Sequence, residues 1–257
     1  DVARCSVGRP NEYHNEELLY KLFGVNAELL IDHAWGWEPC TMQDVKAYRP
    51  TTSSVSTGQV LHCPYTAEKT RLIVQEMADA LSMDLVDKGI VTDQLVLSVG
   101  YDIGNLADPE RRKAYKGPVV TDFYGRQTPK AAHGTVNLGE HTSSTRAIIA
   151  ATLSLYDEIM DMHLLARRIT LCANHLVTEE NAAPRKAFEQ LDLFTDYAAE
   201  AEKQARAEAE RARERSIQHA LLNVRKRYGK NALVKGMNML EGATAMDRNH
   251  QIGGHRA

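Results

Sequence analysis

Between residues 53 and 177 the apolar positions switch between a strand period and a helix period, twice over. Strands are predicted at 53–63, which is rich in Ser, Thr and Val, and at 95–99, where Leu and Val alternate with other residues. The helix predicted between them is capped by Thr66 and stops at Gly89. Its apolar residues recur about one turn apart, at Ile73, Met77, Leu81 and Leu85.

The second half of this stretch repeats the pattern. Strands are predicted at 131–138 and 168–177, around a helix that starts at Thr142 or Ser143. The residues expected to point inward from that helix are Ile149, Leu153, Tyr156 and Met160. The order β-α-β-β-α-β predicts an α+β fold of the ferredoxin-like, split βαβ kind, with both helices on one face of a four-stranded sheet. The other face stays open, and its last strand presents Arg168, Thr170, Cys172 and Asn174.

The segments on either side have different patterns. Residues 16–36 predict two short helices around a Gly24-Val25 turn, with Asn26 as the cap of the second helix. Residues 37–52 contain two prolines and no helical period, so a linker is expected. Residues 197–228 are dense in Ala, Glu, Arg and Lys and predict a long exposed helix. Residues 229–257 are rich in Gly and Asn and are expected to fold only against another surface.

Composition narrows the class of protein. The chain has 257 residues, 43% hydrophobic and 25% charged, as in soluble globular proteins, and no apolar run long enough for a membrane helix. Its four cysteines form no C-x-x-C pair, so a zinc site is not expected. The net charge is −3, and residues 51–180 hold 16 acidic against 12 basic residues, but a basic cluster occupies 108–130. Because no initiator Met or signal peptide opens the sequence, we expect it to be truncated at its N-terminus.

The helical pair near the N-terminus carries a first resemblance. Leu19-Tyr20-Lys21-Leu22-Phe23-Gly24-Val25-Asn26-Ala27-Glu28-Leu29-Leu30 is similar to the thumb of Y-family (DinB/UmuC) translesion DNA polymerases. In that family a helix-hairpin-helix turn offers backbone N–H groups to a DNA phosphate. A glycine lets the backbone approach closely, and a helix N-terminus adds positive potential. The resemblance implies that Gly24, Val25 and Asn26 contact DNA.

The β-α-β-β-α-β module resembles the little-finger domain of the same family, whose open sheet lies along DNA and holds phosphates without reading sequence. The resemblance rests on Ser53-Ser54-Val55-Ser56, on His133-Gly134-Thr135 and on Arg167-Arg168-Ile169. It departs from the family in charge, because the little finger is usually basic and residues 51–180 are net negative. The DNA-binding residues that it implies are Ser54, Ser56, Thr57, His133, Gly134, Thr135, Arg167, Arg168 and Thr170.

Gln190-Leu191-Asp192-Leu193-Phe194 resembles the pentapeptide by which bacterial proteins bind the sliding clamp, and it follows the little finger as in the family. The resemblance implies that Gln190 and Leu191 contact the clamp and that Leu193 and Phe194 enter its apolar pockets. Such a peptide binds weakly alone and acts by raising effective concentration.

Together these resemblances imply a partial thumb at 1–50, a little finger at 51–180, a clamp-binding linker at 181–195 and a charged helical tail at 196–257. The family's Mg²⁺-binding carboxylates lie in a palm domain, and none of the acidic residues here matches those motifs. We therefore expect no catalytic residue, cofactor or metal in this chain, with Mg²⁺ in the palm of the parent protein. The expected partners are primer–template DNA and the bacterial sliding clamp, not a membrane, in the cytoplasm at the nucleoid.

Three other functions fit parts of the pattern. An RNA-recognition domain shares the element order but stacks bases on aromatic residues, which the predicted strands lack. A small-molecule regulatory domain would explain neither the pentapeptide nor the helical hairpin. A stand-alone accessory protein that binds DNA and the clamp without catalysis would explain both.

Overall fold

The computed structural model describes residues 1–48, 53–122, 125–182, 197–252 and 255–256. The chain divides into two compact units, Asp1–Thr51 and Thr52–Ala257. Among the described residues, no helix is both long and apolar enough to cross a membrane.

In the described part of the first unit the secondary structure consists of four short helices, α1 (Val2–Ser6), α2 (Glu16–Phe23), α3 (Asn26–Ala34) and α4 (Met42–Ala47). The predicted helical pair is therefore confirmed as α2 and α3. The short helix α4 lies in the segment expected to be a linker, and a capping box formed by Thr41 and Asp44 starts it. A six-residue helix defined by its cap has no apolar period long enough to be recognised in a sequence.

The second unit is built on one antiparallel sheet of β1 (Val55–Tyr65), β2 (Ile90–Tyr101), β5 (Ala132–Thr142) and β6 (Ala166–Asn174). The strands lie in the order β1-β6-β2-β5, and the short β7 (Val177–Thr178) pairs with the start of β2. Helix α5 (Ala67–Lys88) connects β1 to β2 across β6, and α8 (Thr145–Ile159) connects β5 to β6 across β2. The two crossovers are thus interleaved, and the strands predicted from the sequence are present.

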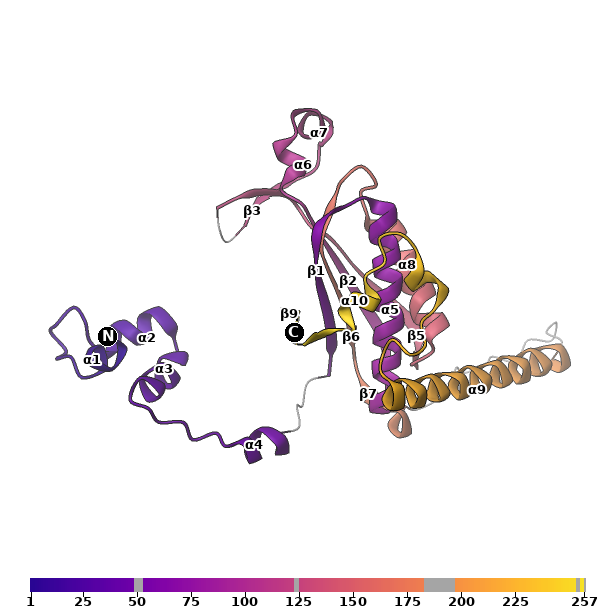
Figure 1. Ribbon diagram of the computed structural model, residues 1–257, viewed down its shortest axis with the longest axis horizontal. Helices are drawn as coiled ribbons and strands as arrows, with labels where there is room; N and C mark the ends of the chain where they lie inside the picture. The colour runs from indigo at the N-terminus through magenta and orange to yellow at the C-terminus, as the bar shows by residue number, and fades with distance from the viewer. Residues whose placement is uncertain (49–52, 123–124, 183–196, 253–254, 257) are drawn as a thin grey trace. The chain divides into compact units, whose positions relative to one another are not determined.

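Both crossover helices cover the same face of the sheet, as predicted (Figure 1). Thr66 caps α5 and Gly89 ends it in the left-handed conformation, and its four predicted inward residues are fully buried. On α8 the cap is Ser144, and the predicted inward residues Tyr156 and Met160 are buried. Ile149 and Leu153 are only partly buried, and Ile148 and Leu155 are buried in their place. The α+β class is confirmed.

The segment between β2 and β5 forms a lobe at one end of the sheet, at the top of Figure 1. It contains α6 (Gly104–Ala107), α7 (Pro109–Ala114) and a hairpin of β3 (Val119–Thr121) and β4 (Gln127–Pro129). We refer to residues 102–130 as the basic lobe, because they carry the predicted basic cluster.

The C-terminal part of the second unit packs back against α5 and the start of α8. The long helix α9 (Tyr197–Tyr228) is present as predicted, and Gln218 on it donates hydrogen bonds to Ser143 O and Thr145 Oγ1, each at 2.9 Å. The chain continues through a 3-10 turn (Gly236–Met239), α10 (Ala245–Arg248), β8 (Gln251–Ile252) and β9 (His255–Arg256). Residues 235–248, which we call the C-terminal strap, lie against α5, whose buried Glu76 accepts hydrogen bonds from Asn238 and Thr244.

Candidate nucleic-acid interface

The strand pairing decides which side chains reach the open face, because residues directly opposite one another share a face. Ser56 pairs with Cys172, and Cys172 pairs with Val96, which in turn pairs with Thr135. The four open-face residues predicted on β6 alternate with buried Ile169, Leu171 and Ala173, so that prediction is confirmed. The open face consists of Ser56, Gly58, Val60, Gln94, Val96, Ser98, Gly100, His133, Thr135, Asn137, Arg168, Thr170, Cys172 and Asn174.

Small, uncharged polar side chains dominate the middle of this face. One row across the strands contains Gly58, Thr170, Ser98 and His133. Hydroxyls and thin side chains let another backbone approach while they donate hydrogen bonds to it. Burial raises the pKa of the Cys172 thiol, and a hydrogen bond involving Ser54 partly lowers it, so the thiol stays protonated at neutral pH.

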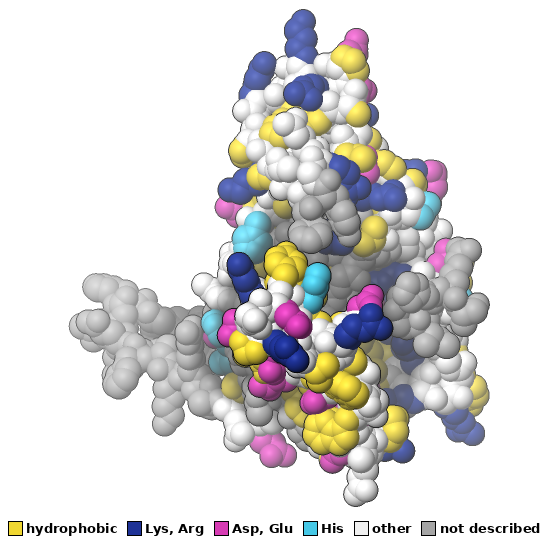
Figure 2. Space-filling model, turned by 90° about the vertical axis from the view of Figure 1, so that its left-hand side faces the viewer, with side chains coloured by type: hydrophobic (Ala, Val, Ile, Leu, Met, Phe, Trp, Pro, Cys, Tyr) yellow, Lys and Arg dark blue, Asp and Glu magenta, His cyan; other side chains and the backbone are white. Residues whose placement is uncertain are grey.

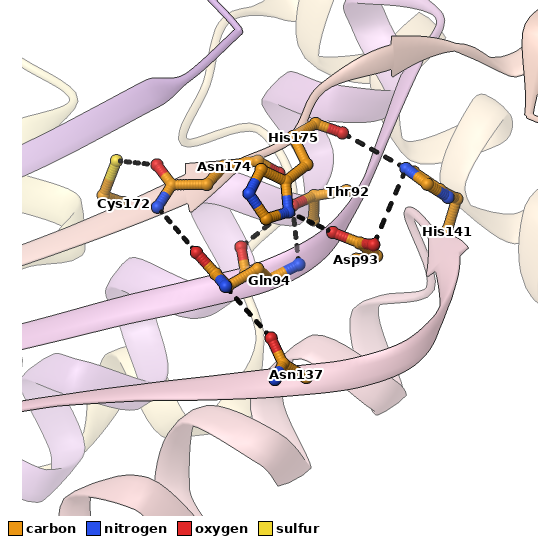
Figure 3. Close-up of polar contacts among 8 residues, drawn as sticks. All are labelled: Thr92, Asp93, Gln94, Asn137, His141, Cys172, Asn174 and His175. Atoms are coloured by element: carbon orange, nitrogen blue, oxygen red, sulfur yellow. Dashed lines mark hydrogen bonds and ion pairs between the residues drawn. The ribbon is translucent and has the colours of Figure 1, made fainter.

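At one end of the face, amide side chains form a ladder across three strands (Figure 3). The Sγ of Cys172 donates to Asn174 Oδ1 at 3.2 Å, and Asn174 Nδ2 donates to Gln94 Oε1 at 3.0 Å. Gln94 Nε2 then donates to Asn137 Oδ1 at 3.0 Å. The ladder fixes the rotamers of these side chains and leaves further donors and acceptors available to a ligand.

Beside the ladder, two histidines surround one carboxylate (Figure 3). His175 Nδ1 lies 2.8 Å from Asp93 Oδ1, and His141 Nε2 lies 3.9 Å from Asp93 Oδ2. His175 has a φ of 51°, which is unusual for a residue other than glycine, and the contact with Asp93 holds it there. This cluster shapes the turn after β6.

Positive charge on the open face itself is sparse. Arg168 is exposed and has no ion pair among the described residues, whereas the Nε of Arg167 lies 3.9 Å from Asp102. The basic lobe supplies more cations, and the Lys and Arg side chains on it stand out at the top of Figure 2. A hollow of about 660 Å³ joins the lobe to the sheet, with Arg126 on one side and Arg167 and Arg168 on the other. Cationic groups therefore lie at one end of a mostly neutral face.

Two of the residues implied by the resemblance face the helices instead. Thr57 pairs with the buried Leu171, and its hydroxyl accepts a hydrogen bond from Arg248 Nη2 at 3.4 Å. Gly134 lies beneath α8, where an added Cβ would come within 2.8 Å of Leu155. Their positions follow from the two-residue period of a strand, since each is one residue away from an open-face position.

Sequence reasoning did not single out several residues of the open face. Gln94, Ser98 and Asn137 became members only through strand pairing, which no local pattern reveals. Ser54 and Ser56 are exposed at the start of β1, and His133, Thr135 and Thr170 lie on the open face as the resemblance implied.

The hairpin of the first unit has its glycine in the expected place. Gly24 has a φ of 58°, and no atom lies within 4 Å of where its Cβ would be. The prediction that Asn26 caps α3 is wrong: the helix begins at Asn26, Val25 takes the cap position, and no side chain caps it. Val25 is exposed at this turn, and the Ala27 N–H donates to the backbone oxygen of Gly24 at 3.0 Å.

Gln190, Leu191, Leu193 and Phe194 lie outside the described residues. Within the described part of the chain, no three His, Cys, Asp or Glu side chains are grouped so as to hold a metal ion.

The sequence profile of the impB/mucB/samB family C-terminal domain matches residues 52–193, which include the whole sheet, both crossover helices and the basic lobe. No curated protein matches the chain significantly. The match covers more than half of the sequence, and it begins where the second compact unit begins. The chain belongs to the impB/mucB/samB family, and residues 52–193 are the C-terminal region of a Y-family DNA polymerase.

Proposed function

We propose that this chain is the DNA-binding and clamp-tethering portion of a bacterial translesion DNA polymerase, acting in DNA repair and damage-tolerant replication. The observation that carries the proposal is the uncovered sheet face, which is lined by small hydroxyl and amide side chains in a chain of the Y-family. We interpret the interleaved βαβ units as the ferredoxin-like little finger of that family.

The chemistry of the face favours contact with the DNA backbone. A polymerase that copies any template needs contacts that position the duplex without reading base edges, and phosphate contacts do this. Thr170, Ser98 and Thr135 offer hydroxyl donors, and Arg168 together with the basic lobe supplies positive charge. Because most of the face is neutral, we expect weak binding that depends on a few cationic contacts.

The hairpin at Gly24, Val25 and Asn26 is proposed as a separate phosphate contact. Gly24 has a positive φ and no side chain caps α3, although the Ala27 N–H donates to Gly24 O at 3.0 Å, so the contact would use the other N–H groups of the first turn. A helix N-terminus with free N–H groups attracts phosphate. The contact would therefore not require a basic side chain.

The clamp tether is proposed from the sequence of Gln190–Phe194. In the clamp-bound state, Leu193 and Phe194 would be buried, and burying one such side chain contributes roughly 1.5–3 kcal/mol. A peptide spanning 186–198 should bind the bacterial sliding clamp at roughly micromolar strength. Changing Leu193 and Phe194 to Ala should abolish most of that binding, whereas Asp192→Ala should change it little. Equal binding by the original and the doubly substituted peptide would rule out the tether.

DNA binding is tested by titrating labelled primer–template duplexes of several sequences with the 257-residue chain at several salt concentrations. We expect weak affinity that is independent of sequence and falls with salt, with a log–log slope of about −0.9 per phosphate neutralised. Arg168→Ala should weaken all sequences equally. Affinity that is unaffected by salt would refute phosphate binding.

A further inference from the structure

A hollow of about 480 Å³ lies where the open face meets the outer edge of β1. β1 is the last strand of the sheet order, so this edge has no neighbouring strand in that sheet. One wall comes from the open face, and the other comes from α10 and β8, which we call the C-terminal segment and which lie near β1 (Figure 1). The lining residues are Gly58, Gln59, Val60, Arg168, Thr170, Arg248 and Gln251.

Among the described residues that line the hollow, the two arginines are the only charged ones, and they come from opposite walls. Arg248 is fixed at the end of α10, where its Nη2 donates to Thr57 Oγ1 at 3.4 Å. Arg168 reaches the hollow from the open face of β6 and is exposed. Neither guanidinium has a carboxylate within ion-pairing distance among the described residues, so both charges are available to an anion.

The surroundings of Arg248 are unfavourable for a cation by itself. Burial lowers the pKa of Arg248, while the charge of Glu76 acts in the opposite direction. An arginine side chain nevertheless stays protonated in proteins, so a partly desolvated positive charge persists at the edge of the sheet. An anion in the hollow would compensate that charge, and a guanidinium matches the geometry of a phosphate.

We propose that this hollow is a phosphate-binding subsite in which Arg248 and Arg168 hold one backbone phosphate of a DNA strand. The DNA-binding surface then continues from the open face around the edge of β1, and the C-terminal segment becomes part of it. The inference rests on the proposed DNA-binding function and goes beyond it by giving the C-terminal segment a role. Thr170 and Gln251 supply neutral hydrogen-bonding groups beside the phosphate.

The test compares salt titrations of a primer–template duplex for the wild-type chain and for Arg248→Gln. Losing one phosphate contact should weaken binding to every sequence and make the log–log salt slope less negative by about 0.9. The matched control is Arg213→Gln, which removes an exposed arginine from α9 and should leave the slope unchanged. Replacing chloride by inorganic phosphate at constant ionic strength should reduce DNA binding of the wild type more than that of Arg248→Gln, if free phosphate also occupies the subsite.

A further variant separates charge from folding. Thr57→Val removes the hydrogen bond that positions Arg248 but keeps the guanidinium, so it should retain the wild-type salt slope. If Thr57→Val loses as much affinity as Arg248→Gln, the position of the strap and not the charge is responsible, and the subsite is refuted. If Arg248→Gln equals the control while Arg168→Ala weakens binding, the subsite is refuted and the DNA-binding function stands. If the wild-type chain shows no salt-dependent binding, the proposed function fails first.

Discussion

Removing the carboxylate of Glu76 should release the C-terminal strap from the body of the second unit. Glu76 is 3% exposed, although it is charged and lies on a helix. Its Oε1 accepts from Asn238 Nδ2 at 2.7 Å, and its Oε2 accepts from the backbone N–H groups of Thr244 and Ala245 at 2.8 and 3.1 Å. The Thr244 hydroxyl adds a longer contact to Oε2 at 3.4 Å, so Glu76→Ala would remove the acceptor of four donors.

The size of the effect follows from these hydrogen bonds. A hydrogen bond to a charged group contributes about 1.5–3 kcal/mol, and removing one partner of a buried charged network costs about 3–5 kcal/mol. The orphaned donors recover hydration if the strap lifts away, so the cost appears as local opening and the hydrophobic core stays folded. A loss of about 3 kcal/mol corresponds to roughly a hundredfold increase in the open population.

Hydrogen–deuterium exchange read on peptides covering 235–248 measures this opening directly. In Glu76→Ala, exchange of those peptides should accelerate by about a hundredfold while β2 and β6 keep their protection. Glu76→Gln should give an intermediate result, because its amide oxygen still accepts but its NH₂ group faces a donor. The matched control is Glu68→Ala, an exposed glutamate in the first turn of the same helix. Unchanged protection of the strap in Glu76→Ala would refute the reasoning.

Three further predictions follow from other parts of the second unit. Gly134→Val should destabilise the fold by about 1–3 kcal/mol in urea unfolding, because the valine side chain would enter the packed space under α8. Thr135→Val, on the opposite face of the sheet, is the control. Equal urea midpoints for the two variants would contradict the tight packing at Gly134. The pKa of Asp157 is lowered by hydrogen bonds from Arg71, and both side chains are about half exposed. At pH values above the ordinary Asp pKa the pair should therefore stabilise the fold by at most about 1 kcal/mol, and this contribution should be lost as the pH falls through the lowered pKa. A stability difference between wild type and Arg71→Met that does not change with pH would contradict this. Burial raises the pKa of Cys172, so iodoacetamide should modify it more slowly than the exposed thiols at neutral pH and faster as the pH rises. Bound DNA should protect Cys172 from modification, and no protection by saturating DNA would argue against contact at the open face.

Positive charge is scarce on the open face of the sheet. Arg168 is the only arginine or lysine among the open-face residues. Other cations come from the basic lobe at one end and, under our proposal, from Arg248 at the edge of β1. DNA binding would then depend on residues at the edges of the sheet more than on those at its centre, which fits the net negative charge of residues 51–180.

The sequence by itself determined the elements that rest on local chemistry. Thr66 and Gly89 marked the ends of α5 because a cap and a left-handed glycine act within one turn of chain. The alternation along β6 gave its buried and open faces, because a strand has a two-residue period whatever its neighbours are. Gly24 marked the turn between α2 and α3, because a positive φ is a local property that glycine adopts readily.

Only the tertiary structure decided which distant residues meet. The order β1-β6-β2-β5 brings Ser56, Cys172, Val96 and Thr135 into one row, and pairing across such separations leaves no local signal. The strap was expected to fold only against another surface, and that surface proved to be α5 of the same chain. A buried Glu76 looks like any solvated helix residue in the sequence, because its partners lie more than 160 residues away. Long-range hydrogen bonds and strand register depend on the packed chain, and the sequence could not reveal them.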